Sequence, residues 1–254
     1  GIALGTIIAE WSTVIFAVWL IMRELNFRRE PGNEFWPRSR LLDAAALKKM
    51  LAANRDIMIR TLLLVFSFGF FINQSAQFGD VMLAANHILL QLISFAAFFL
   101  DGYAFVVESL VGSSVGARRR DSFDIAVKRS SILALVTATA LALLLLVFGD
   151  LAVAMLTDLE PVQTAAQGSL FLAAIYIFFS FAAFQLDGVF IGASFTRQMR
   201  NAAFLSIAVF MFAWWILMDR FGVNGLWWAM IIYVAARADA LLLFYPALRK
   251  SIDH

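Results

Sequence analysis

The chain has 254 residues, of which 62% are hydrophobic and 15% are charged, and its mean hydropathy is +0.83. Soluble globular chains are about half apolar and about a quarter charged, so this composition excludes a soluble domain and indicates a membrane helix bundle. With no cysteines, two histidines and a net charge of only +2, the chain offers no disulfide framework, no thiolate metal site and no general basic surface for nucleic acid.

Seven apolar segments are long enough to cross about 30 Å of hydrocarbon. The first is Gly1–Met22, which only Glu10 interrupts. It follows no initiator Met, basic leader or cleavage site, and we therefore expect the chain to be a fragment. The other predicted spans are Ile57–Phe78, Val81–Val115, Val127–Phe148, Val162–Ala193, Asn201–Met218 and Val223–Leu248.

Between the first two spans lies the longest polar stretch, 23–60, in which Pro31-Gly32 and Trp36-Pro37 mark irregular structure. Within it, Leu41–Asn54 repeats apolar residues at helical spacing with basic residues opposite, which predicts a helix on the membrane surface that leads into the next span. The predicted parts of the chain are residues 1–22, a linker over 23–56 and a six-helix lobe over 57–254.

The loop charges alternate in sign along the chain. Loops 23–60, 116–130 and 194–201 and the tail at Arg249-Lys250 are basic, whereas loops 79–81, 149–161 and 219–222 are mainly acidic. By the positive-inside rule, the basic loops and the C-terminus are predicted to be cytoplasmic, which puts residue 1 on the outer side.

Four carboxylates lie inside predicted spans. Asp101 and Glu108 are seven residues apart and so share one helix face, while Asp187 and Glu10 lie on other spans. A charge at the bilayer centre costs at least about 2.5 kcal/mol, so such acids normally face a protein interior or a wet cavity. All four are candidates for binding a coupling ion or a substrate.

Three of these candidates also have a structural interpretation. Asp101 is alternatively a capped structural acid, Glu108 the partner of an arginine, and Glu10 an acid satisfied by other helices. For Arg237 and Asp239, which do not share a helix face, we favour a structural role against neighbouring helices. The remaining polar residues in the spans either line a cavity or form hydrogen bonds between helices, and the cavity candidates are Asn73, Gln74, Gln77 and Gln91.

Two glycine pairs at Gly-xxx-Gly spacing, Gly112/Gly116 and Gly188/Gly192, predict close helix packing. No Walker motif, hydrolase elbow or metal-ligand spacing is present. The sequence therefore predicts neither catalytic residues, a metal site nor an organic cofactor, and we expect the protein not to be an enzyme.

Several segments in order resemble the C-terminal lobe of the multidrug and toxic compound extrusion (MATE) family, in its DinF-like branch. They cover Asn54–Thr61, Gly79–Asn86, Leu100–Ala104, Val107–Gly112, Gly116–Arg118, Leu186–Ala193 and Met199–Asn201. In the same comparison, residues 1–22 resemble the last helix of the N-terminal lobe.

The resemblance implies an all-α membrane bundle, here a six-helix lobe plus one preceding helix, from a twelve-helix antiporter with a central cavity. Such antiporters export organic cations and other amphipathic compounds in exchange for H⁺ or Na⁺ by alternating access. The position of Asp187 matches that of a coupling or substrate carboxylate in many members. The implied partners are the bilayer, the N-terminal lobe and a small cationic or amphipathic substrate, and the implied location is a bacterial inner membrane.

Two other functions stay open. A flippase for lipid-linked precursors would need a cationic cavity for phosphate groups, which the few arginines in the spans (Arg60 and Arg237) disfavour. A membrane scaffold without transport would instead bury its acids in structural pairs.

Overall fold

The computed structural model describes residues 2–27 and 43–252, and within these ranges all the regular structure is helical. The chain forms two compact units, Gly1–Lys49 and Met50–His254. The first contains helix α1 (Ile2–Phe27) with Glu10, and the second contains every other candidate site residue. The predicted all-α membrane class is confirmed, because six of the described helices are long and apolar enough to span a bilayer.

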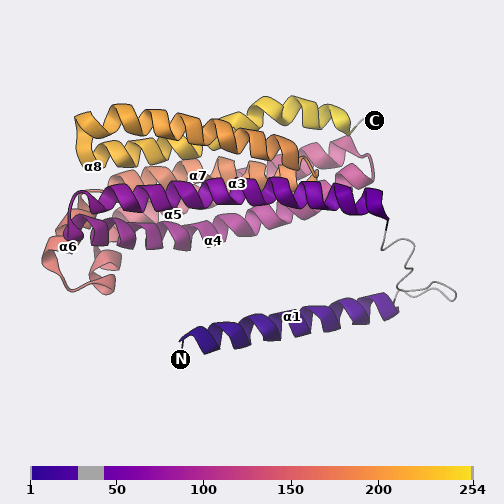
Figure 1. Cartoon of the computed structure of the whole chain (residues 1–254), viewed down its shortest axis with the longest axis horizontal. Coiled ribbons are helices and arrows are strands. Elements are labelled where there is room, and N and C mark those ends of the chain that lie inside the picture. Colours follow the sequence, from indigo (N-terminus) through magenta and orange to yellow (C-terminus); the bar gives the residue numbers. More distant parts are fainter. Residues whose placement is uncertain (1, 28–42, 253–254) are drawn as a thin grey trace. The chain divides into compact units, whose positions relative to one another are not determined.

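Long helices lie side by side in the second unit, with one short helix at an end of the bundle (Figure 1). In chain order they are α3 (Ala44–Ala76), α4 (Asp80–Gly116), α5 (Arg120–Leu156), α6 (Glu160–Gln167), α7 (Leu170–Gly192) and α8 (Thr196–Ser251). Gly222 breaks α8 into two arms at φ 54°, ψ −128°, a backbone conformation that favours glycine. This break confirms the predicted boundary between Met218 and Val223.

The predicted helix over Leu41–Asn54 leads into the next span, as expected, and its location on the membrane surface stays a prediction. From Ala44 onwards it continues without interruption into the following span as α3. The physical reason is that no proline or glycine stands between Ala44 and Gly69, so nothing stops the helix where the polar segment meets the apolar one. The predicted irregular part of the linker falls mostly in 28–42, outside the described residues.

The predicted single span Val162–Ala193 is also wrong in its first part. Residues 160–167 form the separate short helix α6, and the membrane helix α7 begins at Leu170. Pro161 suits the first turn of a helix, and the Gly168-Ser169 step ends α6 before the continuous apolar run starts. The apolar run alone is therefore the transmembrane segment.

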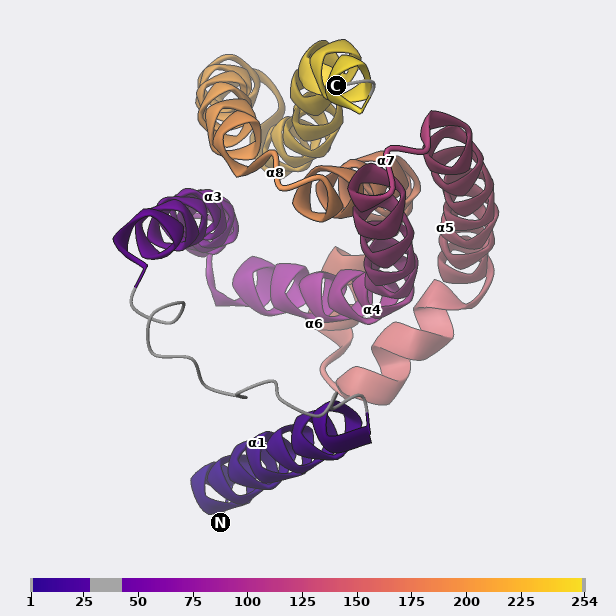
Figure 2. The same cartoon turned by 90° about the vertical axis from the view of Figure 1, so that its right-hand side faces the viewer.

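Helix α7 occupies the middle of the bundle and packs against α4, α5 and α8 (Figure 2). Its contact with α4 is very close, because a Cβ atom on Gly188 would lie 2.3 Å from the carbonyl oxygen of Ala104, and one on Gly192 would lie 2.4 Å from that of Glu108. The predicted close packing at Gly188/Gly192 is confirmed. This contact brings the acids of α4 and α7 to the same region.

Side chains, more than close backbone packing, join α3 to the rest of the bundle. The Phe70 ring of α3 meets the Trp214 ring of α8 at 4.9 Å between centroids. Asn86 of α4 donates a hydrogen bond to Ser75 of α3 and accepts one from the Trp227 indole, at 2.9 and 3.0 Å. These contacts, half-buried at the two rings and buried at Asn86, hold α3 to the bundle near its predicted outer end.

The same tripeptide, Leu-Asp-Gly, occurs at residues 100–102 on α4 and at residues 186–188 on α7, and the two copies provide a matched test of this packing. We expect Gly188→Ala to lower the free energy of unfolding by about 1–3 kcal/mol, because the added methyl group overlaps the α4 backbone. At Gly102 a Cβ has no atom within 4 Å, so Gly102→Ala is expected to be neutral or slightly stabilising. Thermal unfolding of the purified variants in detergent measures both, and equal melting temperatures would contradict the assigned contact.

Candidate functional site

A cavity of about 380 Å³ lies among α3, α4, α7 and α8 in the second unit. It combines charged side chains with aromatic and aliphatic ones. The lining residues are Arg60, Leu64, Phe68, Asp101, Ala104, Phe105, Glu108, Tyr176, Phe184, Asp187, Gly188, Ile191 and Arg237. Three of the four predicted carboxylates thus meet at one place, as their positions on α4 and α7 allow.

Asp187 is the centre of a charged cluster in this cavity. Its Oδ2 atom accepts a hydrogen bond from Arg60 Nη1 of α3 at 2.7 Å and from Arg237 Nη2 of α8 at 2.6 Å. The three side chains are 11–17% exposed, so they are largely removed from solvent. Charge-assisted bonds of this kind are the strong ones, and here they tie three helices together.

The two arginines differ in their remaining contacts. The Arg237 guanidinium also lies over the Tyr233 ring, 5.9 Å from its centroid, which stabilises the cation further. Arg60 Nε is buried and has no hydrogen-bond partner within the described residues. Arg60 therefore depends on Asp187 more strongly than Arg237 does.

Asp101 and Glu108 are half-buried on the cavity side of α4. Unlike Asp187, neither makes a hydrogen bond or an ion pair within the described residues, although Asp101 lies within electrostatic range of Asp187, Arg237 and Arg60. With all groups ionised, the cavity holds three carboxylates against two guanidinium groups. The excess charge is negative and lies on α4.

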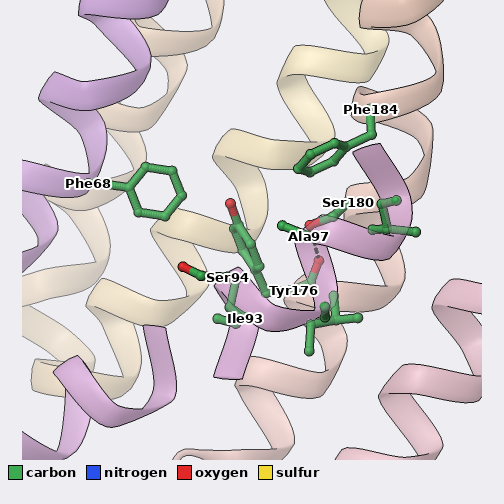
Figure 3. Close-up of a pocket in the computed structure, with 10 residues that line it drawn as sticks. Phe68, Ile93, Ser94, Ala97, Tyr176, Ser180 and Phe184 are labelled. Carbon is green, nitrogen blue, oxygen red and sulfur yellow. Dashed lines mark hydrogen bonds between the residues drawn. The ribbon is translucent and has the colours of Figure 1, made fainter. Parts of the chain in front are cut away.

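Aromatic side chains also line the cavity, and several of them border a smaller pocket of about 60 Å³ as well. Both spaces share Phe68, Tyr176 and Phe184. In Figure 3 these three rings stand around the pocket, and the Ser180 hydroxyl donates a hydrogen bond of 2.7 Å to the Tyr176 carbonyl oxygen. The lining of the site therefore combines acids with aromatic rings.

The other predicted residues lie elsewhere. Glu10 is exposed on α1, in the first unit. None of the four predicted cavity-lining amides borders the charged cavity: Gln74 is buried, whereas Asn73, Gln77 and Gln91 are exposed. They lie nearer the predicted outer ends of α3 and α4, several turns from Arg60 and Asp101. A functional role for these five residues stays a prediction.

Sequence reasoning missed that Arg60 and Arg237 belong to the site. For Arg237, the available signal was a cation within the apolar run 223–248, which requires a counter-ion on another helix. The expected arginine partner of Glu108 is absent from the described part of the chain, and the arginines pair with Asp187. No group of three or more His, Cys, Asp and Glu side chains in this part is arranged to hold a metal ion.

Comparisons with known proteins agree with one another. The MatE family model matches residues 57–216. The chain is 32% identical over 246 residues to DNA damage-inducible protein F of Escherichia coli (strain K12), covering 95% of this chain and 51% of that protein. It is 24% identical over 184 residues to the probable multidrug resistance protein NorM of Photorhabdus laumondii subsp. laumondii, and this match covers 67% of this chain and 39% of that protein.

A solved crystal structure of MATE in the bent conformation superposes with a TM-score of 0.74 at 15% identity, over 84% of this chain and 48% of that one. At this identity the likeness concerns the fold alone. The chain spans about half the length of the E. coli relative and less of the NorM protein.

Removing the carboxylate of Asp187 is expected to lower the free energy of unfolding more than removing that of Asp124. Asp187→Asn leaves two largely buried arginines without a counter-charge, and we expect it to lower the free energy of unfolding by about 3 kcal/mol. Asp124→Asn removes an ion pair with Arg249 that is much more exposed, so its cost is expected to be at most about 1 kcal/mol. Unfolding in mixed detergent micelles measures both, and equal losses would contradict the role of Asp187 as a shared counter-ion.

Proposed function

The chain belongs to the MatE family, and from this premise we propose that it forms one lobe of a secondary antiporter. The antiporter exports organic cations or related amphipathic compounds by alternating access, in exchange for H⁺ or Na⁺ and without an organic cofactor. It resides in a bacterial inner membrane with its C-terminus in the cytoplasm. The N-terminal lobe of the same transporter supplies the facing wall of the cavity.

The observation that supports a cationic substrate best is the pair of acids without partners, Asp101 and Glu108, in a cavity with aromatic walls. An organic cation places its charge near these carboxylates and its apolar part against Phe68, Tyr176 and Phe184. Aromatic faces attract cations as well as apolar groups. The name of the NorM relative, a probable multidrug resistance protein, supports the same substrate class.

Ion coupling requires a carboxylate that can bind and release a proton or Na⁺. In this conformation Asp187 is engaged by two arginines, so Asp101 and Glu108 are the groups available to bind a proton, Na⁺ or the substrate. A ligand that binds one conformation better shifts the population toward it. Exchange of an inorganic cation for an organic one at these acids therefore couples the gradient to export.

The two alternative functions are less well supported. A flippase for lipid-linked precursors needs free cationic groups for phosphates, but both cavity arginines are already paired with Asp187. Binding of a lipid pyrophosphate in preference to organic cations would revive it. A scaffold would pair its acids structurally, as Asp187 is paired, whereas Asp101 and Glu108 have no such partner among the described residues.

The function predicts the loss of transport in carboxylate variants of the complete transporter. Asp101→Asn is expected to abolish gradient-driven efflux of a cationic dye while leaving membrane insertion and thermal stability unchanged, because this carboxylate holds no structural partner. Asp187→Asn is also expected to abolish efflux, but together with the stability loss described above. Inside-out vesicles loaded with a fluorescent organic cation measure the transport.

Asp80→Asn is the matched control, since Asp80 lies on the same helix at its exposed first turn. It is expected to retain full efflux. Full efflux in both Asp101→Asn and Asp187→Asn would overturn the carboxylate assignment.

A further inference from the structure

The two arms of α8 run side by side (Figures 1 and 2). A further groove, here called the α8 groove, lies between them. This groove has a volume of about 390 Å³. Its lining is aliphatic apart from one carboxylate, and consists of Leu205, Val209, Ile232, Ala235, Ala236, Asp239, Ala240 and Leu243. Leu205 and Leu243 are exposed, so the groove opens to the surroundings of the second unit.

The α8 groove is separate from the charged cavity. The two share no lining residue. Arg237 and Asp239 are two residues apart on one helix, so their side chains point to nearly opposite sides. Because Arg237 faces Asp187 in the cavity, Asp239 faces away from it.

Asp239 is exposed in the groove and forms no hydrogen bond or ion pair within the described residues. At about 1.5 Å per residue, it lies about 15 Å along the helix from Arg249 and about 25 Å from Gly222. It is therefore within the hydrocarbon layer if Arg249 marks the headgroup level. A carboxylate at that depth costs at least about 2.5 kcal/mol without a counter-charge, so its environment favours a cation.

We infer that the α8 groove binds lipophilic organic cations from the bilayer, with Asp239 as their counter-ion. The single carboxylate selects the positive charge, and the aliphatic walls accept the apolar part of the ligand. The volume lies within the range of small-molecule sites, about 300–1,000 Å³. The inference rests on the proposed function for its ligand class, but its site is a different one, outside the charged cavity.

Photolabelling of the complete transporter in phosphatidylcholine vesicles tests the site. The probe is a benzophenone with an alkyl-trimethylammonium group, and mass spectrometry locates its adducts. We expect adducts on the groove residues of α8, reduced about tenfold by Asp239→Asn, because the substitution removes the counter-charge but keeps the shape. The isosteric neutral probe, with a tert-butyl group in place of trimethylammonium, is expected to label both proteins equally and weakly.

Asp219→Asn is the matched control, because Asp219 is an exposed acid of α8 that does not line the groove. It is expected to label like the unmodified protein. Equal labelling of Asp239→Asn and the unmodified protein would overturn the inference. Absence of groove adducts in every variant would also overturn it, since another part of the transporter would then cover the groove.

Dye efflux measured in the same proteins separates this inference from the proposed function. Asp101→Asn is expected to lose efflux and keep the groove adducts. If Asp101→Asn and Asp187→Asn both retained full efflux while groove labelling still depended on Asp239, the proposed role of the cavity acids would fail and the α8 site would stand.

Discussion

Two arginines on one carboxylate set the arrangement of the second unit, Met50–His254. A guanidinium group inside a membrane bundle cannot lose its charge, so Arg60 and Arg237 each require a counter-ion. Asp187 serves both through the same oxygen atom, which ties α3 and α8 to the central helix α7. The constraint matters most for α3, because side chains and not close backbone packing hold that helix to the bundle.

The same constraint divides the cavity carboxylates into two kinds. Asp187 has its charge satisfied within the second unit, whereas Asp101 and Glu108 face the cavity without such partners among the described residues. The two Leu-Asp-Gly tripeptides therefore have different environments. Gly188 lies against the α4 backbone and positions its aspartate for the arginines, while Gly102 has open space around it. Negative charge is left on α4 in a cavity that also holds aromatic rings, and this combination suits a ligand with one cationic and one apolar end.

Composition and apolar runs of bilayer length predicted the all-helical membrane class, because such a run has few other stable conformations in a bilayer. Asp101, Glu108, Asp187 and Glu10 were predicted as candidates because a charge inside a membrane span is costly. The structure brings the first three to one cavity, and Glu10 lies elsewhere on α1. The partners of these acids could not be predicted, since the rotation of each helix about its axis depends on packing between distant segments. Gly188 and Gly192 turn one face of α7 toward the α4 backbone. Their Gly-xxx-Gly spacing predicts close packing but does not indicate which helix they pack against.

A double-mutant cycle on Asp187 and Arg237 tests this account most directly. The free energy of unfolding in mixed detergent micelles would be measured for Asp187→Asn, Arg237→Gln and the double variant. Adding Arg237→Gln to Asp187→Asn is predicted to restore part of the lost stability, with a coupling of about 1–3 kcal/mol, because one unpaired charge is then removed. Strictly additive losses would mean that the arginine does not depend on Asp187, and would contradict the central role of this carboxylate.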